Sequence, residues 1–289
     1  MKISLRGAFV LSILLLSIIA SAPAQELTAE QIIAKHIESI GSKDKLGTIK
    51  NQLIFSDARF TFKGAAAKLV GKALILSEGQ KSLWGMNFNS NDYSVERFGY
   101  DGKDVKVGRP NPGTTRSLIG DFIYSNRTVL KDGLLGGTLS SSWALLSSDR
   151  KAKVSVDGKK TIDGKSLIGL SYSPKSGGEV TIKIYFDGET FRHVRTEYAV
   201  VRSASMGVGG VDSSASQSST TFRVVEDFSD FTKMGELTLP KTYKLTYSRI
   251  NAASIAVRQQ TNIDAEWIFT VTNINFNQEL EPNSFNIDG

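Results

Sequence analysis

Apolar and polar residues alternate most clearly in residues 179–201, which read EVTIKIYFDGETFRHVRTEYAVV. Alternation with a period of two is typical of β-strands that bury one face. Asp187 and Gly188 favour the positive φ angles of a tight turn. The segment therefore predicts an antiparallel hairpin with one apolar and one charged face. The apolar face is predicted to hold Val180, Ile182, Ile184, Phe186, Val194, Thr196, Tyr198 and Val200, and the charged face His193, Arg195 and Glu197.

Similar short β-rich runs, separated by Gly, Asn, Asp or Ser, fill much of the remaining chain. Residues 25–40 instead show an apolar stripe at helical spacing, with Thr28 as N-cap and Gln31 completing a capping box. The sequence thus predicts a mainly β protein with a few helices. The further strands are expected at 51–62, 68–77, 80–89, 91–100, 104–107, 153–156, 165–173, 220–227, 237–250 and 266–276, with Asp-Gly turns at 101–102, 157–158 and 163–164.

The alternation stops in residues 109–146, which are rich in Leu, Ile, Phe and Trp and are interrupted by glycines. Long apolar connections of this kind are typical of lids or binding segments. A pair of ordinary core helices is the competing interpretation. With the apolar residues of the strand at 80–89, this segment predicts an apolar ligand cavity. The expected cavity residues are Trp84, Phe88, Phe122, Leu134, Leu135 and Trp143.

The N-terminus has the pattern of a secretory signal peptide. Lys2 and Arg6 precede a short apolar run, and Ala22-Pro23-Ala24 has the small residues that signal peptidase requires. We expect cleavage after Ala24, export, and one domain over residues 25–289. The Gly- and Ser-rich residues 203–219 predict a flexible surface loop. The chain has no cysteine, so it forms no disulfide and carries no lipid on a cysteine.

Composition argues against several function classes. The formal net charge of +6 is spread over the sequence without a basic stripe, so we expect no nucleic-acid partner. His36 and His193 have no neighbours at metal-ligand spacing, and we expect structural roles for both. Glu226, Asp227 and Asp230 match no calcium-loop template and predict a solvated turn. We therefore expect no catalytic residues, metal or cofactor, and no enzyme.

Four stretches together resemble the bacterial outer-membrane lipoprotein-sorting proteins, the LolA-like superfamily. They are LTAEQIIAKHIESIGSKDKLGTIKN, YFDGETFRHVRTEY, GELTLPKTYKLTY and FNQELEPNSFNI. The resemblance implies an unclosed antiparallel β-barrel, a half-barrel, with helices over its concave face. It also implies that a strand arginine helps to hold the lid closed, for which Arg97 or Arg59 are the candidates here.

The same resemblance implies a periplasmic carrier. Such a protein binds the acyl chains of a lipid or lipoprotein and moves them towards the outer membrane, between an inner-membrane donor and an outer-membrane acceptor protein. The alternative is a periplasmic interaction or sensor protein that uses the same half-barrel to bind a protein partner. Residues 109–146 and 203–219 make this chain longer than a minimal carrier, which leaves the cargo open.

Overall fold

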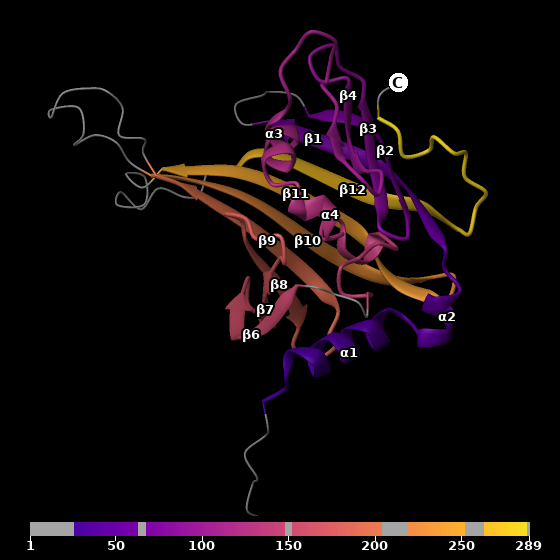
Figure 1. The fold of residues 1–289 in the computed structure, drawn as a ribbon, viewed down its shortest axis with the longest axis vertical. Helices are drawn as coiled ribbons and strands as arrows, with labels where there is room; N and C mark the ends of the chain where they lie inside the picture. The colour runs from indigo at the N-terminus through magenta and orange to yellow at the C-terminus, as the bar shows by residue number, and fades with distance from the viewer. Residues whose placement is uncertain (1–25, 63–67, 148–151, 204–218, 252–262, 288–289) are drawn as a thin grey trace, which may run out of the picture.

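The computed structural model describes residues 26–62, 68–147, 152–203, 219–251 and 263–287. It contains one antiparallel sheet of twelve strands that curves into an open half-barrel (Figure 1), as predicted. The strands are β1 (Asn51–Phe62), β2 (Leu69–Glu78), β3 (Lys81–Phe88), β4 (Val95–Tyr100), β5 (Val105–Val107), β6 (Lys153–Ile162), β7 (Lys165–Ser173), β8 (Thr181–Asp187), β9 (His193–Arg202), β10 (Thr220–Met234), β11 (Leu237–Asn251) and β12 (Ile263–Phe276).

The order of the strands explains the shape of the molecule. Neighbouring strands follow the order β5-β4-β3-β2-β1-β12-β11-β10-β9-β8-β7-β6, so the first and last strands pair in the middle. The free edges are β5 and β6, which are consecutive in the sequence. The chain between them must therefore pass from one edge of the sheet to the other. It does so across the concave face, where Figure 1 shows α3 (Leu118–Ser125) and α4 (Thr128–Lys131) in front of the strands.

The N-terminal helix α1 (Ala29–Ile40) lies at one end of the half-barrel, followed by the short α2 (Lys43–Gly47). The predicted capping box is present: the Gln31 backbone N–H donates to Thr28 Oγ1, and the Thr28 N–H donates to Gln31 Oε1. The helix begins at Ala29 rather than at residue 25, because the N-cap has extended backbone angles. A side chain on Gly41 would lie 2.8 Å from Leu237, so glycine allows the close approach to β11.

The predicted hairpin is formed by β8 and β9, with two differences. Its turn is longer than two residues, since the Asp187 N–H donates to the Arg192 carbonyl and Phe191 has the positive φ. The register also shifts at a bulge between Tyr185 and Phe186. The placement of His193 and Val194 was therefore wrong: His193 is buried on the concave face, while Val194 is only half-buried.

Two other predictions were wrong in detail. Asp157 and Gly158 form no hairpin turn, because they lie within β6, where the register shifts at a bulge. Strand β10 runs on to Met234, well beyond the predicted end at residue 227. The Asp163-Gly164 turn is confirmed, with φ angles of 51° and 78°. Residues 1–24, and all of 203–219 except its two end residues, lie outside the described part, so the signal peptide and the loop stay predictions.

Candidate functional site

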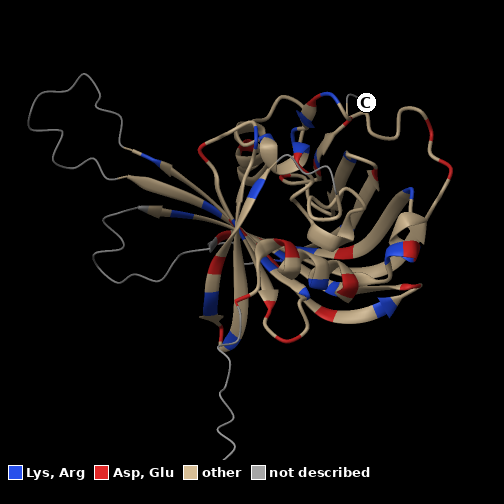
Figure 2. Cartoon of the chain, turned by 60° about the horizontal axis from the view of Figure 1, so that its bottom comes forward, with Lys and Arg blue, Asp and Glu red and all other residues tan. Residues whose placement is uncertain are grey.

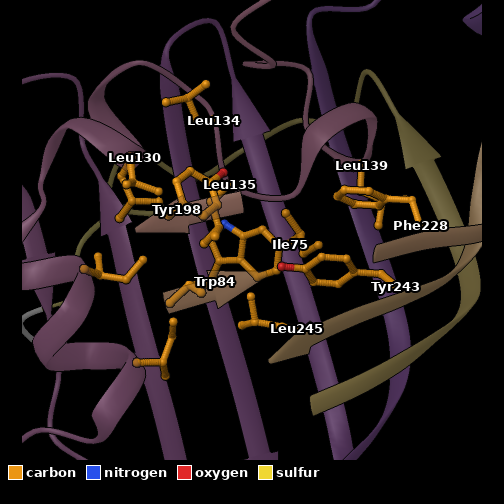
Figure 3. Packing of buried hydrophobic residues seen from close by; sticks show 14 of the residues in the cluster. Ile75, Trp84, Leu130, Leu134, Leu135, Leu139, Tyr198, Phe228, Tyr243 and Leu245 are labelled. Carbon is orange, nitrogen blue, oxygen red and sulfur yellow. The ribbon is translucent and has the colours of Figure 1, made fainter. Parts of the chain in front are cut away.

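The concave face of the sheet carries the main hydrophobic cluster of the protein. Its members come from almost every strand, from α1 and from residues 109–146, which we call the covering segment. All six residues predicted to line a cavity belong to this cluster. Trp84 and Phe88 come from β3, and the other four from the covering segment. Figure 3 shows Leu135 beside the Trp84 indole, with Tyr198 and Tyr243 close to it.

These six side chains fill the space that the prediction assigned to a ligand. None of them is more than 6% exposed. Phe122 also lines a surface pocket, but Trp84, Leu134 and Trp143 are completely enclosed by neighbouring protein atoms. The structure thus brings the predicted residues together as a packed interior that the chain itself occupies. Their role as a ligand site stays a prediction.

Two glycines bring the covering segment unusually close to the sheet. A Cβ atom on Gly136 would lie 2.5 Å from the Trp84 ring, and one on Gly137 would lie 2.5 Å from His193 Nδ1. Both residues have positive φ angles, 81° and 50°. Glycine is therefore needed at these positions for backbone conformation and for packing.

The carboxylate of Glu226 on β10 ties the covering segment to the sheet. Its Oε1 accepts from the Gly136 N–H (2.7 Å) and the Tyr243 hydroxyl (2.8 Å), and its Oε2 accepts from the Tyr198 hydroxyl (2.6 Å). The residue is fully buried, so the prediction of a solvated turn was wrong for it. Burial raises the pKa of Glu226 to about 7, although the three hydrogen bonds act in the opposite direction.

A second tie joins the covering segment to α1. Trp143 Nε1–H donates to His36 Nε2 (3.0 Å), and His36 Nδ1 lies 3.1 Å from the Phe191 carbonyl. Because a carbonyl only accepts, Nδ1 carries the proton and Nε2 is free to accept. Burial lowers the pKa of His36 to about 4, in agreement with a neutral ring.

His193 completes this aromatic cluster. Its ring stacks on Trp143 with 4.7 Å between centroids, and its Nε2 lies 2.7 Å from Thr196 Oγ1. Burial and the neighbouring His36 lower the pKa of His193 well below its usual value. Both histidines are inside the protein and hydrogen-bonded, which is the structural role that the sequence predicts for them.

Smaller polar contacts hold the rest of the covering segment. The backbone N–H of Ser141 donates to Ser77 Oγ on β2 (2.8 Å), and the two serine oxygens are 2.9 Å apart. The Tyr172 hydroxyl donates to Asp132 (3.1 Å) just after α4. The arginines suggested as lid residues, Arg59 and Arg97, are both exposed and face away from the concave side. Neither holds the covering segment.

An apolar groove opens beside the point where the covering segment reaches α1. It has a volume of about 500 Å³, within the range of small-molecule sites. Its wall includes Leu145, which also belongs to the main cluster, so the groove borders the apolar interior at this side chain. The other apolar side chains lining it are Ile37, Ile40, Leu46, Ile49, Leu146 and Leu237.

The described residues offer little for metal or redox chemistry. Within them, no three His, Cys, Asp or Glu side chains gather as they would around a metal ion. No helix in the described part of the chain is long and apolar enough to cross a membrane. What the site provides is a large apolar interior, a cover fixed by a few polar contacts, and a groove at its edge.

Comparison with solved structures identifies the fold. A LolA superfamily protein from Nitrosomonas europaea matches with a TM-score of 0.50 and 13% identity, over 91% of this chain and 99% of the other. The chain has a LolA-like fold. A domain described as an outer membrane lipoprotein-sorting protein, from Vibrio parahaemolyticus, matches with a TM-score of 0.42 and 13% identity, over 88% of this chain and 97% of its own.

A DUF1329 family protein from Desulfovibrio piger matches the LolA-like fold of this chain with a TM-score of 0.40 and 9% identity, over 89% of this chain and 97% of its own. Because the last two TM-scores are below 0.5, the fold assignment rests on the first structure. No protein-family model and no curated protein matches the chain by sequence.

Proposed function

We propose that this protein is a periplasmic carrier that binds the acyl chains of a lipid or lipoprotein against the concave face of the sheet. It moves them towards the outer membrane, between an inner-membrane donor and an outer-membrane acceptor protein. The observation that carries the proposal is that, among the residues that the structure describes, the covering segment fills the apolar interior in place of a second sheet or long helices. The LolA-like fold supports the same function.

In this proposal the acyl chain replaces the side chains of the covering segment. A chain of about 15 carbons gains roughly 12 kcal/mol from burial, at about 0.8 kcal/mol per CH₂. Leu134, Leu135 and Trp143 lose roughly 5–9 kcal/mol when they leave the interior, at about 1.5–3 kcal/mol for each side chain, and the hydrogen bonds to Gly136 and Ser141 must be rehydrated. The net affinity is then modest, which suits a carrier because it must release its cargo.

The groove supplies a route for the exchange. It is apolar, it borders Leu145 and Leu146 at the end of the covering segment, and it lies next to α1 and α2. An acyl chain that entered there would first contact the residues that have to move. We expect the covering segment to peel away from this end, starting at Ser141 and Trp143.

A reversible lock tests the proposal. The chain has no cysteine, so the double variant Ser77→Cys/Ser141→Cys forms one disulfide at a site where the serine oxygens are 2.9 Å apart. We expect the reduced variant to bind a fluorescent fatty acid saturably with a Kd of about 1 μM, and the oxidised variant at least about tenfold more weakly. The single variant Ser77→Cys, treated with the same oxidant, is the control.

Two results would count against the carrier. If the oxidised protein binds as well as the reduced one, the covering segment does not move for the ligand. If neither form nor the native protein binds, the interior is a closed core. The second candidate function is a periplasmic interaction or sensor protein that uses the same half-barrel to bind a protein partner, and the burial of Trp84, Leu134 and Trp143 favours it because the interior is then a core.

A further inference from the structure

A second pocket, distinct from the apolar groove, lies beside α3 and the ends of strands β9, β10 and β11. It also has a volume of about 500 Å³, and three arginines line it: Arg116, Arg202 and Arg249. Figure 2 shows basic residues near the ends of the strands that lead into the grey loops. The rest of its lining is Leu118, Asp121, Phe122, Tyr124, Ser125, Asn126, Val200, Phe222 and Tyr247.

This pocket is amphipathic. Its floor consists of Phe122, Val200 and Tyr247, which are buried and belong to the main hydrophobic cluster. Arg202 follows Val200 by two residues on β9, so both side chains project from the same face of the strand. The apolar interior of the half-barrel therefore continues into a wall that carries positive charge.

The arginines are held in place but incompletely paired. The Arg116 guanidinium stacks on Tyr124 at 3.7 Å from the ring centroid, and that of Arg202 lies 5.5 Å from the centroid of Phe222. Within the described residues, Nε of Arg116 is buried and has no hydrogen-bond acceptor. A buried donor without an acceptor is costly, and an arginine accommodates an oxyanion especially well.

The acidic groups nearby compensate only part of this charge. Asp121 is 3.9 Å from Arg116, but its side chain is 66% exposed, so the interaction is weak. Asp264 is largely buried and pairs with Arg249 at 3.0 Å. A fourth arginine, Arg127, lies 4.7 Å from the same Tyr124 ring, which adds to the positive field at the pocket mouth.

We propose that this pocket binds the anionic headgroup of the cargo, a phosphate or carboxylate, while the acyl chains occupy the adjoining interior. The acyl part of this inference rests on the proposed function, whereas the oxyanion site stands on the arginines. Arg116 and Arg202 contact the anion, whereas Arg249, which is already paired with Asp264, lines the rim. The cargo class is thus an anionic amphiphile rather than a zwitterionic or neutral one.

The test compares two soluble lipids with the same acyl chains, dihexanoyl phosphatidic acid and dihexanoyl phosphatidylcholine, by calorimetric titration of the purified full chain. We expect the anionic lipid to bind at least tenfold more tightly. Arg116→Gln and Arg202→Gln should each remove most of that preference and should lower the affinity for phosphatidylcholine, whose phosphodiester is compensated by the choline cation, much less. Arg59→Gln, which removes an exposed arginine on the outer face of β1, is the matched control and should change neither affinity.

The outcomes separate the headgroup site from the carrier function. Equal affinity for the two lipids, or a preference that survives both arginine substitutions, would overturn the headgroup proposal while leaving acyl binding intact. Inorganic phosphate that binds as tightly as phosphatidic acid would assign the pocket to a free anion and also overturn it. If neither lipid binds, the carrier function fails, and phosphate alone decides the oxyanion site: binding that Arg116→Gln abolishes supports it, and no binding refutes it.

Discussion

The two halves of the covering segment meet the sheet in different ways. The first half contains α3 and α4, whose backbone groups bond within the segment, as when the Asn126 N–H donates to the Phe122 carbonyl. The second half has one short 3₁₀ turn, Gly137–Leu139. The backbone N–H groups of Gly136 and Ser141 there donate to side-chain oxygens of the sheet. Buried backbone groups must be paired, so irregular chain needs partners outside itself. The second half is therefore the part whose position the sheet controls.

Removal of the Glu226 carboxylate should weaken the attachment of the second half to the sheet most strongly. Glu226→Ala leaves the donors of Gly136, Tyr198 and Tyr243 buried without acceptors, at about 1–3 kcal/mol each before relaxation. We expect a total loss of about 3–5 kcal/mol and a melting temperature lower by roughly 10 °C. Glu96→Ala is the comparison, since Glu96 is also buried but contacts the first half of the covering segment through Ser117, as well as accepting from Tyr93. Equal melting of Glu226→Ala and native protein would contradict the interpretation.

A methyl group at Gly137 should have the next largest effect. Gly137→Ala places a Cβ 2.5 Å from the buried His193 ring at a φ of 50°, so both strain and overlap oppose it. We expect a loss of about 2–3 kcal/mol in urea denaturation. Gly164→Ala is the control, because Gly164 has a positive φ but no atom within 4 Å of an added Cβ. If both variants lose the same stability, close packing at Gly137 contributes nothing.

The raised pKa of Glu226 should make the stability of the protein depend on pH. Its pKa is about 7 in the folded protein against 4.5 unfolded, so the folded state binds more protons between these values. The contribution of Glu226 to the free energy of unfolding is therefore fully present below about pH 4.5 and is lost as the pH rises to about 7. Buried His36, with its pKa lowered from 6.5 to about 4, acts in the opposite direction as the pH falls below 6.5.

The variant Glu226→Gln isolates the carboxyl contribution. As the pH falls from 7 to 4.5, the native protein should gain about 2 kcal/mol relative to this variant, in denaturant unfolding measured at each pH. A stability difference that does not change with pH would show that Glu226 is ionised in both states or in neither.

The smallest effect is expected for the contact between the covering segment and α1. Trp143→Phe removes the indole donor to His36 but keeps an aromatic ring against His193. We expect a loss of about 1 kcal/mol, typical of one hydrogen bond, and easier release of this end of the segment. Faster binding of a fluorescent fatty acid at unchanged β-sheet signal would support the peeling route, and slower binding would contradict it.

The architecture could be predicted because it depends on local patterns. Each of the twelve strands appears in the sequence as a run of alternating or apolar residues, and the cap at Thr28 is a short-range signal. The bulges at Tyr185 and in β6 could not be found in this way, because each depends on how a partner strand is aligned. One bulge was enough to move His193 from the predicted outer face to the interior.

The sequence predicted the burial of the apolar residues but not the polar contacts among them. Leu, Phe and Trp in a long connection predict burial from their residue type alone. The role of a polar residue depends on its hydrogen-bond partners, which only the fold identifies. Glu226 was assigned to a solvated turn because it lies in an acidic cluster with Asp227 and Asp230. Val224, Glu226 and Phe228 nevertheless form a buried alternating row that marks Glu226 as inward-facing. The arginines of the second pocket come from three separate parts of the chain, and only the fold brings them together.

The central pairing of β1 with β12 also determines the order in which the molecule folds. Strands β2 to β5 and β6 to β11 pair with sequence neighbours, so each group is able to form from local contacts. The pairing of β1 with β12 brings together positions as distant as Lys50 and Asn277, which are 227 residues apart in the sequence. Contacts between residues so far apart form slowly during folding. We expect the two arms to form early and the pairing of β1 with β12 to form last, so that in a chain lacking its final strand the covering segment, rather than the sheet, connects the two arms.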